Sequence, residues 1–510
     1  MFIDMKKTII IIFYIFNGVA LMGQSNYLNK LIKLPYPYFG GIYDIINTKD
    51  GNYYFTYDIQ NLNVDSSFIN LIKIDSKGDT IWAKRYGDVK SKHRYTARSL
   101  KIDKDDNIII TGFVYEPDIT YGGRSLGFVL KTDKNGNQKW LKNFTDGSYI
   151  CKLAETVICA DGNYLFTGLR ETYNAQIKDA DYADPYIVKI DTSGNLIWQK
   201  VVNYSPYQQE IILGVTETKN KEYLMVGYSY NGNTGFDNFI LKLNDKGQIM
   251  VYEAYGDGNQ NEFLTGIIPS DDNNFIVSGM NSDKNPQSNL QRRSIITKIN
   301  EKGERIWTKS YEEKTEHFTY NKLLKLPNGE FIGVGGQDKK PYLCGATKFD
   351  TAGNVKWHRS YIYNKKNGTS QYNWGANTTP DNGIIFCGAA VDTTTVPKNG
   401  EGWLLKLDSL GCDKKGCATS TATEEAVKEA FFSVYPNPSS DNITIQLGEE
   451  NTENTSVKII NTYGTVLYKN KITANEKMIQ IDMSNYAAGT YFVMVENEKV
   501  KGVKKVVVLK

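Results

Sequence analysis

Carboxylates are the residues of this sequence that could do chemistry most directly. Glycoside cleavage needs only two carboxyl groups at the right separation. Acidic residues that could form such a pair lie in long irregular segments, and they are Asp118, Glu171, Asp179, Asp181, Asp184 and Asp283. The chain has only three His and contains no Gly-x-Ser-x-Gly, His-Glu-x-x-His or phosphate-loop motif. The sequence therefore favours a non-catalytic protein, and an enzyme that uses loop carboxylates is the alternative.

Aromatic and arginine residues in the same kind of segment favour binding. Rings beside polar groups suit sugars and peptides, whose surfaces are partly apolar. The candidate ligand-binding residues are Tyr121, Arg124, Tyr173, Tyr182, Tyr207, Phe236, Arg292, Tyr372 and Trp374. Because the chain contains 35 Tyr, a general spread of tyrosine over the surface is the alternative interpretation.

Charge and residue spacing exclude several partners. Lys plus Arg is 60 and Asp plus Glu is 57, which leaves a net charge of +3 and no field to attract nucleic acid. No Cys-x-x-Cys pair or His-x-x-x-His spacing indicates zinc. Repeated Asp-x-x-Gly-Asn segments lack the ligand spacing of a calcium loop and fit hairpin turns instead. We therefore expect no metal and no cofactor.

The elements that position these residues come from an internal repeat. Segments such as 71–86 and 129–144 share an apolar strand, a turn with Gly and a second strand with Trp. The turn glycines are Gly78, Gly136, Gly194, Gly247, Gly303, Gly353 and Gly411. Each copy also contains two strand patterns upstream, so one copy is four short strands. Seven such copies predict a seven-bladed β-propeller over residues 26–417.

Two details of the repeat complete this all-β prediction. The seventh copy has no fourth strand after Gly411, and residues 26–34 form an unpaired strand pattern before the first copy. We expect this N-terminal strand to close blade seven, since closure removes free sheet edges. The connections after the second and fourth strands are long and variable, so one face of the ring should carry them all. The tryptophans Trp82, Trp140, Trp198, Trp307 and Trp357 should pack between neighbouring blades.

The N-terminus predicts export. Lys6 and Lys7 precede a short apolar run and small residues, which is typical of a signal peptide over residues 1–24. The run is too short for a stable membrane span. In an oxidising compartment Cys412 and Cys417 are close enough in sequence to form a disulfide, and the pairing of Cys151, Cys159, Cys344 and Cys387 stays open.

A small C-terminal module follows a polar linker, 418–430. Residues 431–510 alternate apolar and polar residues and predict a small β-sandwich. The motif Tyr435-Pro436-Asn437-Pro438, followed by Gly489-Thr490-Tyr491 and a basic terminal strand, resembles the type A C-terminal sorting domain of type IX secretion cargo. This resemblance implies that residues 431–510 contact the secretion machinery and a sortase, and that the protein reaches the outer surface of a Gram-negative cell after Sec export through the periplasm.

Together these features predict a secreted or cell-surface protein. The long-loop face would bind a glycan, a peptide or another envelope protein. A propeller hydrolase or lyase is the first alternative, and a structural component of the cell surface is the second. Two carboxylates facing each other, one with a raised pKa, would favour the enzyme.

Overall fold

The protein is built from strands in two compact units. The computed structural model describes residues 27–32, 40–59, 67–88, 92–117, 123–174, 179–203, 208–231, 235–256, 260–283, 293–311, 318–337, 343–362, 369–392, 399–414, 432–447, 455–461, 465–473, 476–496 and 501–509. These residues contain no helix, so the all-β prediction is confirmed. The two units are residues 1–418 and 419–510. The predicted signal peptide and linker lie outside the described residues.

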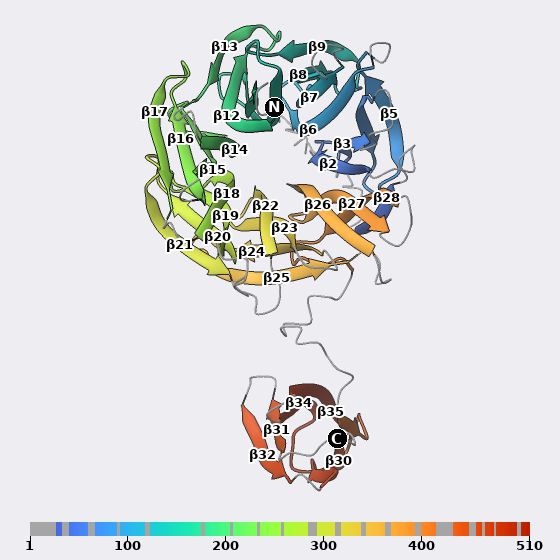
Figure 1. Cartoon of the computed structure of the whole chain (residues 1–510). Coiled ribbons are helices and arrows are strands. Elements are labelled where there is room, and N and C mark those ends of the chain that lie inside the picture. The colour runs from blue at the N-terminus through green and yellow to red at the C-terminus, as the bar shows by residue number, and fades with distance from the viewer. Residues whose placement is uncertain are drawn as a thin grey trace, which may run out of the picture. The chain divides into compact units, whose positions relative to one another are not determined.

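The first unit consists of four-stranded antiparallel groups arranged around a common axis (Figure 1). The first group contains β2 (Gly40–Asn47), β3 (Tyr53–Ile59), β4 (Ile69–Ile74) and β5 (Thr80–Tyr86). The second contains β6 (Arg94–Ile102), β7 (Ile108–Glu116), β8 (Arg124–Thr132) and β9 (Gln138–Phe144). The third contains β10 (Ile150–Ile158), β11 (Tyr164–Asn174), β12 (Asp179–Ile190) and β13 (Leu196–Val201), and a single parallel pairing joins it to the second.

The same order of strands continues along the chain. One group contains β14 (Gln208–Glu217), β15 (Tyr223–Asn231), β16 (Gly235–Leu243) and β17 (Ile249–Tyr255). The next contains β18 (Gln260–Pro269), β19 (Phe275–Asp283), β20 (Arg293–Ile299) and β21 (Arg305–Tyr311), and is followed by β22 (Phe318–Lys325), β23 (Phe331–Gln337), β24 (Cys344–Phe349) and β25 (Val355–Tyr361). The last contains β26 (Thr369–Thr378), β27 (Ile384–Asp392), β28 (Asn399–Leu407) and the N-terminal strand β1 (Leu28–Ile32). This is the propeller-like arrangement that the repeat predicts.

Local turn chemistry forms the hairpins. In the turn after β8, the Asp133 carboxylate accepts hydrogen bonds from the backbone N–H groups of Asn135 and Asn137, each at 2.8 Å. Gly136 has a φ of 73°, a conformation that favours glycine. The carboxylate is therefore occupied by its own turn, as the hairpin interpretation expects.

A buried or partly buried lysine in the third strand of every group pairs with an acid near the first hairpin turn. Lys131 and Asp103 are separated by 3.2 Å, and their side chains are only 6% and 3% exposed. The equivalent pairs are Lys73–Asp50, Lys189–Asp161, Lys242–Glu222, Lys298–Asp272, Lys348–Glu330 and Lys406–Asp381. Each pair ties two strands of one sheet together at the edge where the tight turns lie.

In several groups the outer strand packs against the tight turn of the next group. A Cβ atom added to Gly353 would lie 2.7 Å from the Trp307 ring, and Tyr311 Oη donates a hydrogen bond of 2.7 Å to the Gly353 carbonyl. Trp82 meets Gly136 and Trp357 meets Gly411 in the same way. Trp140 and Trp198 pack against buried clusters between sheets. The tryptophans therefore pack between neighbouring groups of strands, as predicted.

The N-terminal strand occupies the corresponding place on the last sheet. β1 pairs with β28, from Leu28 opposite Lys406 to Ile32 opposite Gly402. The side chains of Leu28 and Lys30 cover Gly78, the turn glycine of the first sheet. β2 also contacts β26 and β27, and buried residues of the two sheets share one cluster.

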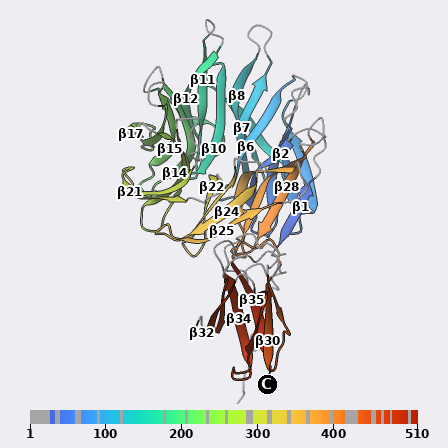
Figure 2. The ribbon, with the colours of Figure 1, turned by 60° about the horizontal axis from the view of Figure 1, so that its bottom comes forward.

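The C-terminal unit has two sheets around one core. The first contains β29 (Phe432–Tyr435), β30 (Asn442–Leu447) and β33 (Met478–Asp482). The second contains β32 (Val466–Ile472), β31 (Thr455–Asn461), β34 (Gly489–Glu496) and β35 (Lys501–Val508). Alternate residues of both sheets, such as Ile443, Ile445, Val493 and Val495, are buried between them. Figure 2 shows the two layers of this unit from the side.

Candidate functional site

The strand directions bring the ends of the second and fourth strands of every group to one edge. Because neighbouring strands in each group are antiparallel, the ends of second and fourth strands share an edge with the starts of first and third strands. We call this edge of the first unit the long-loop face. Most of the long connections lie outside the described residues, so the site is built from the strand ends and adjoining residues that support them.

The structure describes the side chains of two predicted ligand-binding residues. Arg124 begins β8 and Phe236 lies on β16, so they belong to different sheets of the long-loop face. Tyr173, Tyr182, Tyr372 and Trp374 lie in strands, but their side chains are outside the description. Tyr121, Tyr207 and Arg292 lie outside the described residues altogether. The ligand-binding assignment of all nine stays a prediction.

Arg124 takes part in a charged group on the second sheet. Its Nε donates a hydrogen bond of 2.7 Å to Glu116 Oε2, and His93 Nε2 lies 3.9 Å from the other oxygen of Glu116. Next to this group, the Arg94 guanidinium lies over the Tyr115 ring at 4.3 Å. Arg94 thus presents a planar cation over an aromatic ring, and Arg124 presents a second planar cation beside Glu116, a combination that suits sugar rings and acidic groups.

Phe236 belongs to an aromatic cluster between the fourth and fifth groups of strands. We define this cluster as Tyr228, Tyr230, Phe236 and Phe263. Its ring centroids are 4.8 Å apart for Tyr230 and Phe236, 4.9 Å for Phe236 and Phe263, and 5.0 Å for Tyr228 and Phe263. Tyr230 is 36% exposed, so part of the cluster faces solvent. Such a surface can stack against a sugar ring or an apolar peptide side chain.

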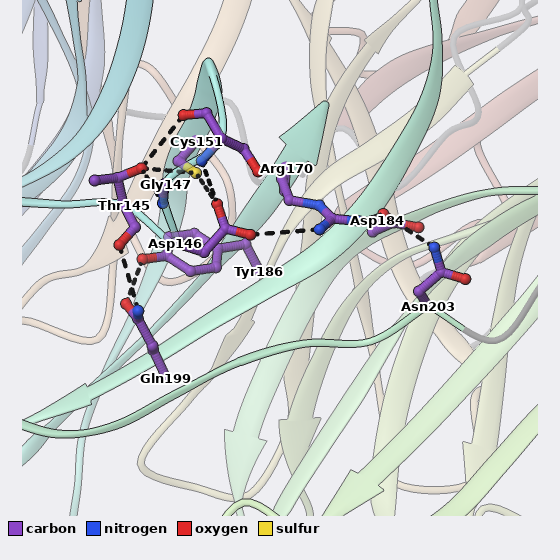
Figure 3. Close-up of polar contacts among 10 residues, drawn as sticks. Thr145, Asp146, Gly147, Cys151, Arg170, Asp184, Tyr186, Gln199 and Asn203 are labelled. Atoms are coloured by element: carbon purple, nitrogen blue, oxygen red, sulfur yellow. Dashed lines mark hydrogen bonds and ion pairs between the residues drawn. The ribbon is translucent and has the colours of Figure 1, made fainter. Parts of the chain in front are cut away.

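A polar network lies on the third group of strands, at the long-loop face (Figure 3). Arg170 on β11 forms an ion pair with Asp184 on β12, and its Nη1 lies 3.4 Å from Asp146 Oδ2. The other oxygen of Asp146 accepts hydrogen bonds from the Cys151 thiol at 3.3 Å and the Ser148 N–H at 2.9 Å. Asn203 Nδ2 adds a contact of 3.5 Å to Asp184. One guanidinium therefore holds two carboxylates from different segments.

Cys151 is not suited to nucleophilic chemistry in this network. Its side chain is buried, and burial raises the pKa of the thiol to about 11. The thiol therefore stays protonated at neutral pH, whereas the thiolate is the nucleophile. Cys151, Cys159, Cys344 and Cys387 are free thiols. Cys412 is disulfide-bonded, and its expected partner Cys417 lies outside the described residues.

Glu210, at the start of β14, is an unusual acid that the sequence did not indicate. Its side chain is fully buried, and Tyr252 Oη donates a hydrogen bond of 2.6 Å to one carboxylate oxygen. The other oxygen has no partner among the described residues. Burial raises the pKa of Glu210 to about 7, and the negative charge of Asp184 adds to this effect. Glu210 therefore resembles a general acid in pKa but not in accessibility.

Two of the candidate catalytic acids have described side chains, and both of these side chains form ion pairs. Glu171 lies 2.8 Å from Lys152, and Asp184, 2% exposed, is paired with Arg170. Asp179 and Asp283 lie in strands whose side chains at these positions are not described, and Asp118 and Asp181 also lack described side chains. No group of three potential metal ligands occurs within the described part of the chain.

The motifs of the C-terminal unit converge on its last strand. Asn437 Nδ2 donates a hydrogen bond of 2.7 Å to the Lys505 carbonyl, and Asn437 Oδ1 accepts one of 2.9 Å from the Val507 N–H. Gly489, Thr490 and Tyr491 pair with Val508, Val507 and Val506. Two motifs some fifty residues apart thus hold opposite edges of β35.

The comparisons with known proteins identify this unit. Residues 433–509 match the family described as secretion system C-terminal sorting domain. The C-terminal unit therefore belongs to the sorting domains of type IX secretion, as its motifs indicated. The protein is exported, and it is attached to the outer cell surface or released from it. No described helix is long and apolar enough to cross a membrane. No curated protein matches the chain.

Solved structures resemble the first unit at low identity. A polysaccharide lyase, the PL25 ulvan lyase bound to -[GlcA(1-4)Rha3S]-, has a TM-score of 0.47 and 10% identity over 74% of this chain and 96% of that chain. The β-propeller domain of the Trilobed protease from Pyrococcus furiosus has a TM-score of 0.41 and 9% identity over 76% of this chain and 99% of that chain. The α-L-arabinofuranosidase Arb93A from Fusarium graminearum has a TM-score of 0.40 and 7% identity over 71% of this chain and 92% of that chain. These similarities do not extend to an activity or a ligand.

Proposed function

We propose that the first unit is a closed, seven-bladed β-propeller that binds an extracellular glycan or peptide through its long-loop face without catalysis. Closure is supported by β1, which completes the sheet of β26, β27 and β28. It is also supported by Lys30, which lies 2.5 Å from Asp79 next to Gly78, as Lys84 reaches Asn137 next to Gly136. A closed ring holds the strand ends of the long-loop face at fixed distances, which lowers the entropic cost of binding.

The aromatic cluster is the observation that carries the binding proposal. Tyr230 and Phe236 lie at strand ends on the long-loop face, and Tyr230 presents part of its ring to solvent. The arginines near Tyr115 and Glu116 add planar donors at the same face. Rigid aromatic surfaces with neighbouring polar groups are typical of carbohydrate and peptide sites.

The engagement of the described acids favours binding over turnover. Arg170 neutralises Asp184, Lys152 neutralises Glu171, and Glu210 is buried. A glycosidase needs one carboxyl group that reaches the leaving oxygen and a second that reaches the sugar or its water. These paired and buried carboxylates therefore fit a structural role in holding the strands of the long-loop face together.

The test is a binding screen of the full chain against glycans and peptides, with product analysis of every ligand that binds. We expect binding without product, and we expect Phe236→Ala to weaken it at least tenfold. Met250→Ala is the control, because Met250 is an exposed apolar residue on the outer strand β17, away from the cluster. Product release would establish the enzyme alternative, and binding to no probe would favour the structural one.

The C-terminal unit supplies the route to the cell surface. We propose that the secretion machinery recognises and binds the unit at the face that includes β35. We also propose that a sortase then removes residues 431–510. Intact mass of the surface-exposed protein tests this. A mature chain that retains Lys510 outside the cell would contradict sortase removal.

A further inference from the structure

The middle of the first unit carries charged side chains that neither the hairpins nor the long-loop face explains. The first strand of each group lies innermost, and neighbouring first strands contact one another around the axis (Figure 1). Each of them has a register shift that inserts one extra residue near its centre. The inserted residues are Tyr43, Arg98, Ala154, Leu213, Thr265, Asn321 and Trp374.

Arg98 is a cation held in place by aromatic rings. It is exposed, although it lies on the innermost strand β6. Its guanidinium is 4.6 Å from the centre of the Tyr43 ring and 5.5 Å from that of Phe113. Arg98 has no acid partner among the described residues. Rings on two strands therefore orient a guanidinium whose hydrogen-bond donors stay available.

Two lysines also lie on innermost strands. Lys322 on β22 interacts electrostatically with Glu155 on β10 and Asp44 on β2, and Lys101 on β6 interacts with Lys322. β26 separates β22 from β2 on one side of the ring, and β14 and β18 separate it from β10 on the other. Side chains of these strands can therefore interact only across the middle.

Two acids, Asp44 and Glu155, face the three cations of this region, and their charges raise the pKa of Lys322. Both oxygens of Asp44 accept backbone hydrogen bonds, from the N–H groups of Ile45 and Leu100 at 3.0 Å each. Glu155 is the other acid that faces Lys101 and Lys322. The two amines form no hydrogen bond within the described residues. Burial lowers the pKa of Lys101, and the positive charge of Lys322 lowers it further.

We propose that Arg98, Lys101 and Lys322 form a binding site on the axis for an oxyanion, such as the carboxylate or sulfate group of an acidic ligand. A guanidinium supplies paired donors for such a group, and ammonium groups supply charge and single donors. The anion would relieve the repulsion between the two lysines. This site is separate from the aromatic cluster and rests on the proposed function only for the closed ring.

The test is calorimetric titration of the full chain with sodium glucuronate, inorganic sulfate and inorganic phosphate, with glucose as the uncharged counterpart. We expect at least one anion to bind and glucose not to bind. Arg98→Gln and Lys322→Gln should weaken anion binding at least tenfold. Lys49→Gln is the matched control, because the Lys49 side chain is 81% exposed and lies in a tight turn. Tightest binding of glucuronate points to an acidic sugar, and tightest binding of phosphate or sulfate points to a free anion.

A second measurement uses the wild-type protein, so it does not require the variants to fold. Saturating anion should slow the acetylation of Lys101 and Lys322 in the wild-type protein and leave Lys49 unchanged, as read by peptide mass spectrometry. Absence of binding by all three anions, or equal affinity in the wild type and both variants, would overturn the site. Phe236→Ala should leave anion binding unchanged, so failure of the aromatic cluster and failure of the axial site are distinguishable.

Discussion

The buried pair of Lys131 and Asp103 predicts a large loss of stability from one substitution. Lys131 Nζ donates hydrogen bonds to Tyr164 Oη at 2.7 Å and to the Thr192 carbonyl at 3.1 Å, and it lies 3.2 Å from Asp103 Oδ2. Lys131→Met keeps most of the side-chain volume but leaves the Asp103 carboxylate buried without a cation. Removing one partner of a buried pair costs about 3 to 5 kcal/mol.

The expected loss lies at the lower end of that range. The Asp103 carboxylate still accepts hydrogen bonds from Tyr164 Oη at 2.7 Å and from Asn107 Nδ2 at 2.9 Å. We therefore expect about 3 kcal/mol. Unfolding entropy near 2.1 cal/mol/K per residue gives roughly 0.8 kcal/mol/K for a unit of about 390 residues, so the melting temperature should fall by about 4 °C.

Differential scanning calorimetry of the full chain measures this shift. Lys49→Met is the control, because Lys49 and Asp106 form an ion pair of 2.7 Å with side chains that are 81% and 43% exposed. Exposed pairs contribute about 0 to 1 kcal/mol, so the control should move the melting temperature by about 1 °C or less. Equal shifts in the two variants would refute the argument that burial makes the repeated lysine pairs important for stability.

Two further predictions concern Glu210 and Asn437. The raised pKa of Glu210, about 7 against an ordinary 4.5, means that the folded protein favours the protonated acid. Its stabilising contribution is complete below about pH 4.5 and is lost as the pH rises through 7. Glu210→Gln should therefore melt close to the wild type at pH 4.5 and be about 2 to 3 kcal/mol more stable than it at pH 8; melting curves that differ by the same amount at both pH values would contradict this. Asn437→Ala removes two hydrogen bonds to β35, which should cost about 1 to 2 kcal/mol in the C-terminal unit and reduce the protein accessible to protease at the cell surface. Asn470→Ala, at an exposed position on β32, is the control, and an equal surface fraction in both variants would show that the contact is dispensable for export.

Residues of the described sites that the sequence did not indicate share one property. Glu210 and Tyr252 are 42 positions apart, and Arg98 and Tyr43 are 55 apart in the chain. No local motif marks either pair, because the partners meet only after sheets pack together. A signal for the buried lysine pairs was available, since Lys73, Lys131 and their equivalents occupy the same place in every copy. A lysine repeated inside an apolar strand needs a buried acid, and a search for acids in the first turn would have found it.

The sequence by itself determined the repeating strands, their tight turns and the sorting domain. These depend on interactions within a few residues, such as Asp133 with Asn137 and the positive φ of Gly136, so the pattern can be read along the chain. Only the tertiary structure decided which sides of the strands meet. It placed Lys322 opposite Glu155 and Asp44 across the axis, gathered Phe236 and Phe263 from two sheets, and buried Glu210 beside Tyr252. These arrangements depend on distances set by the packing of whole sheets, and that packing has no signature in any one segment.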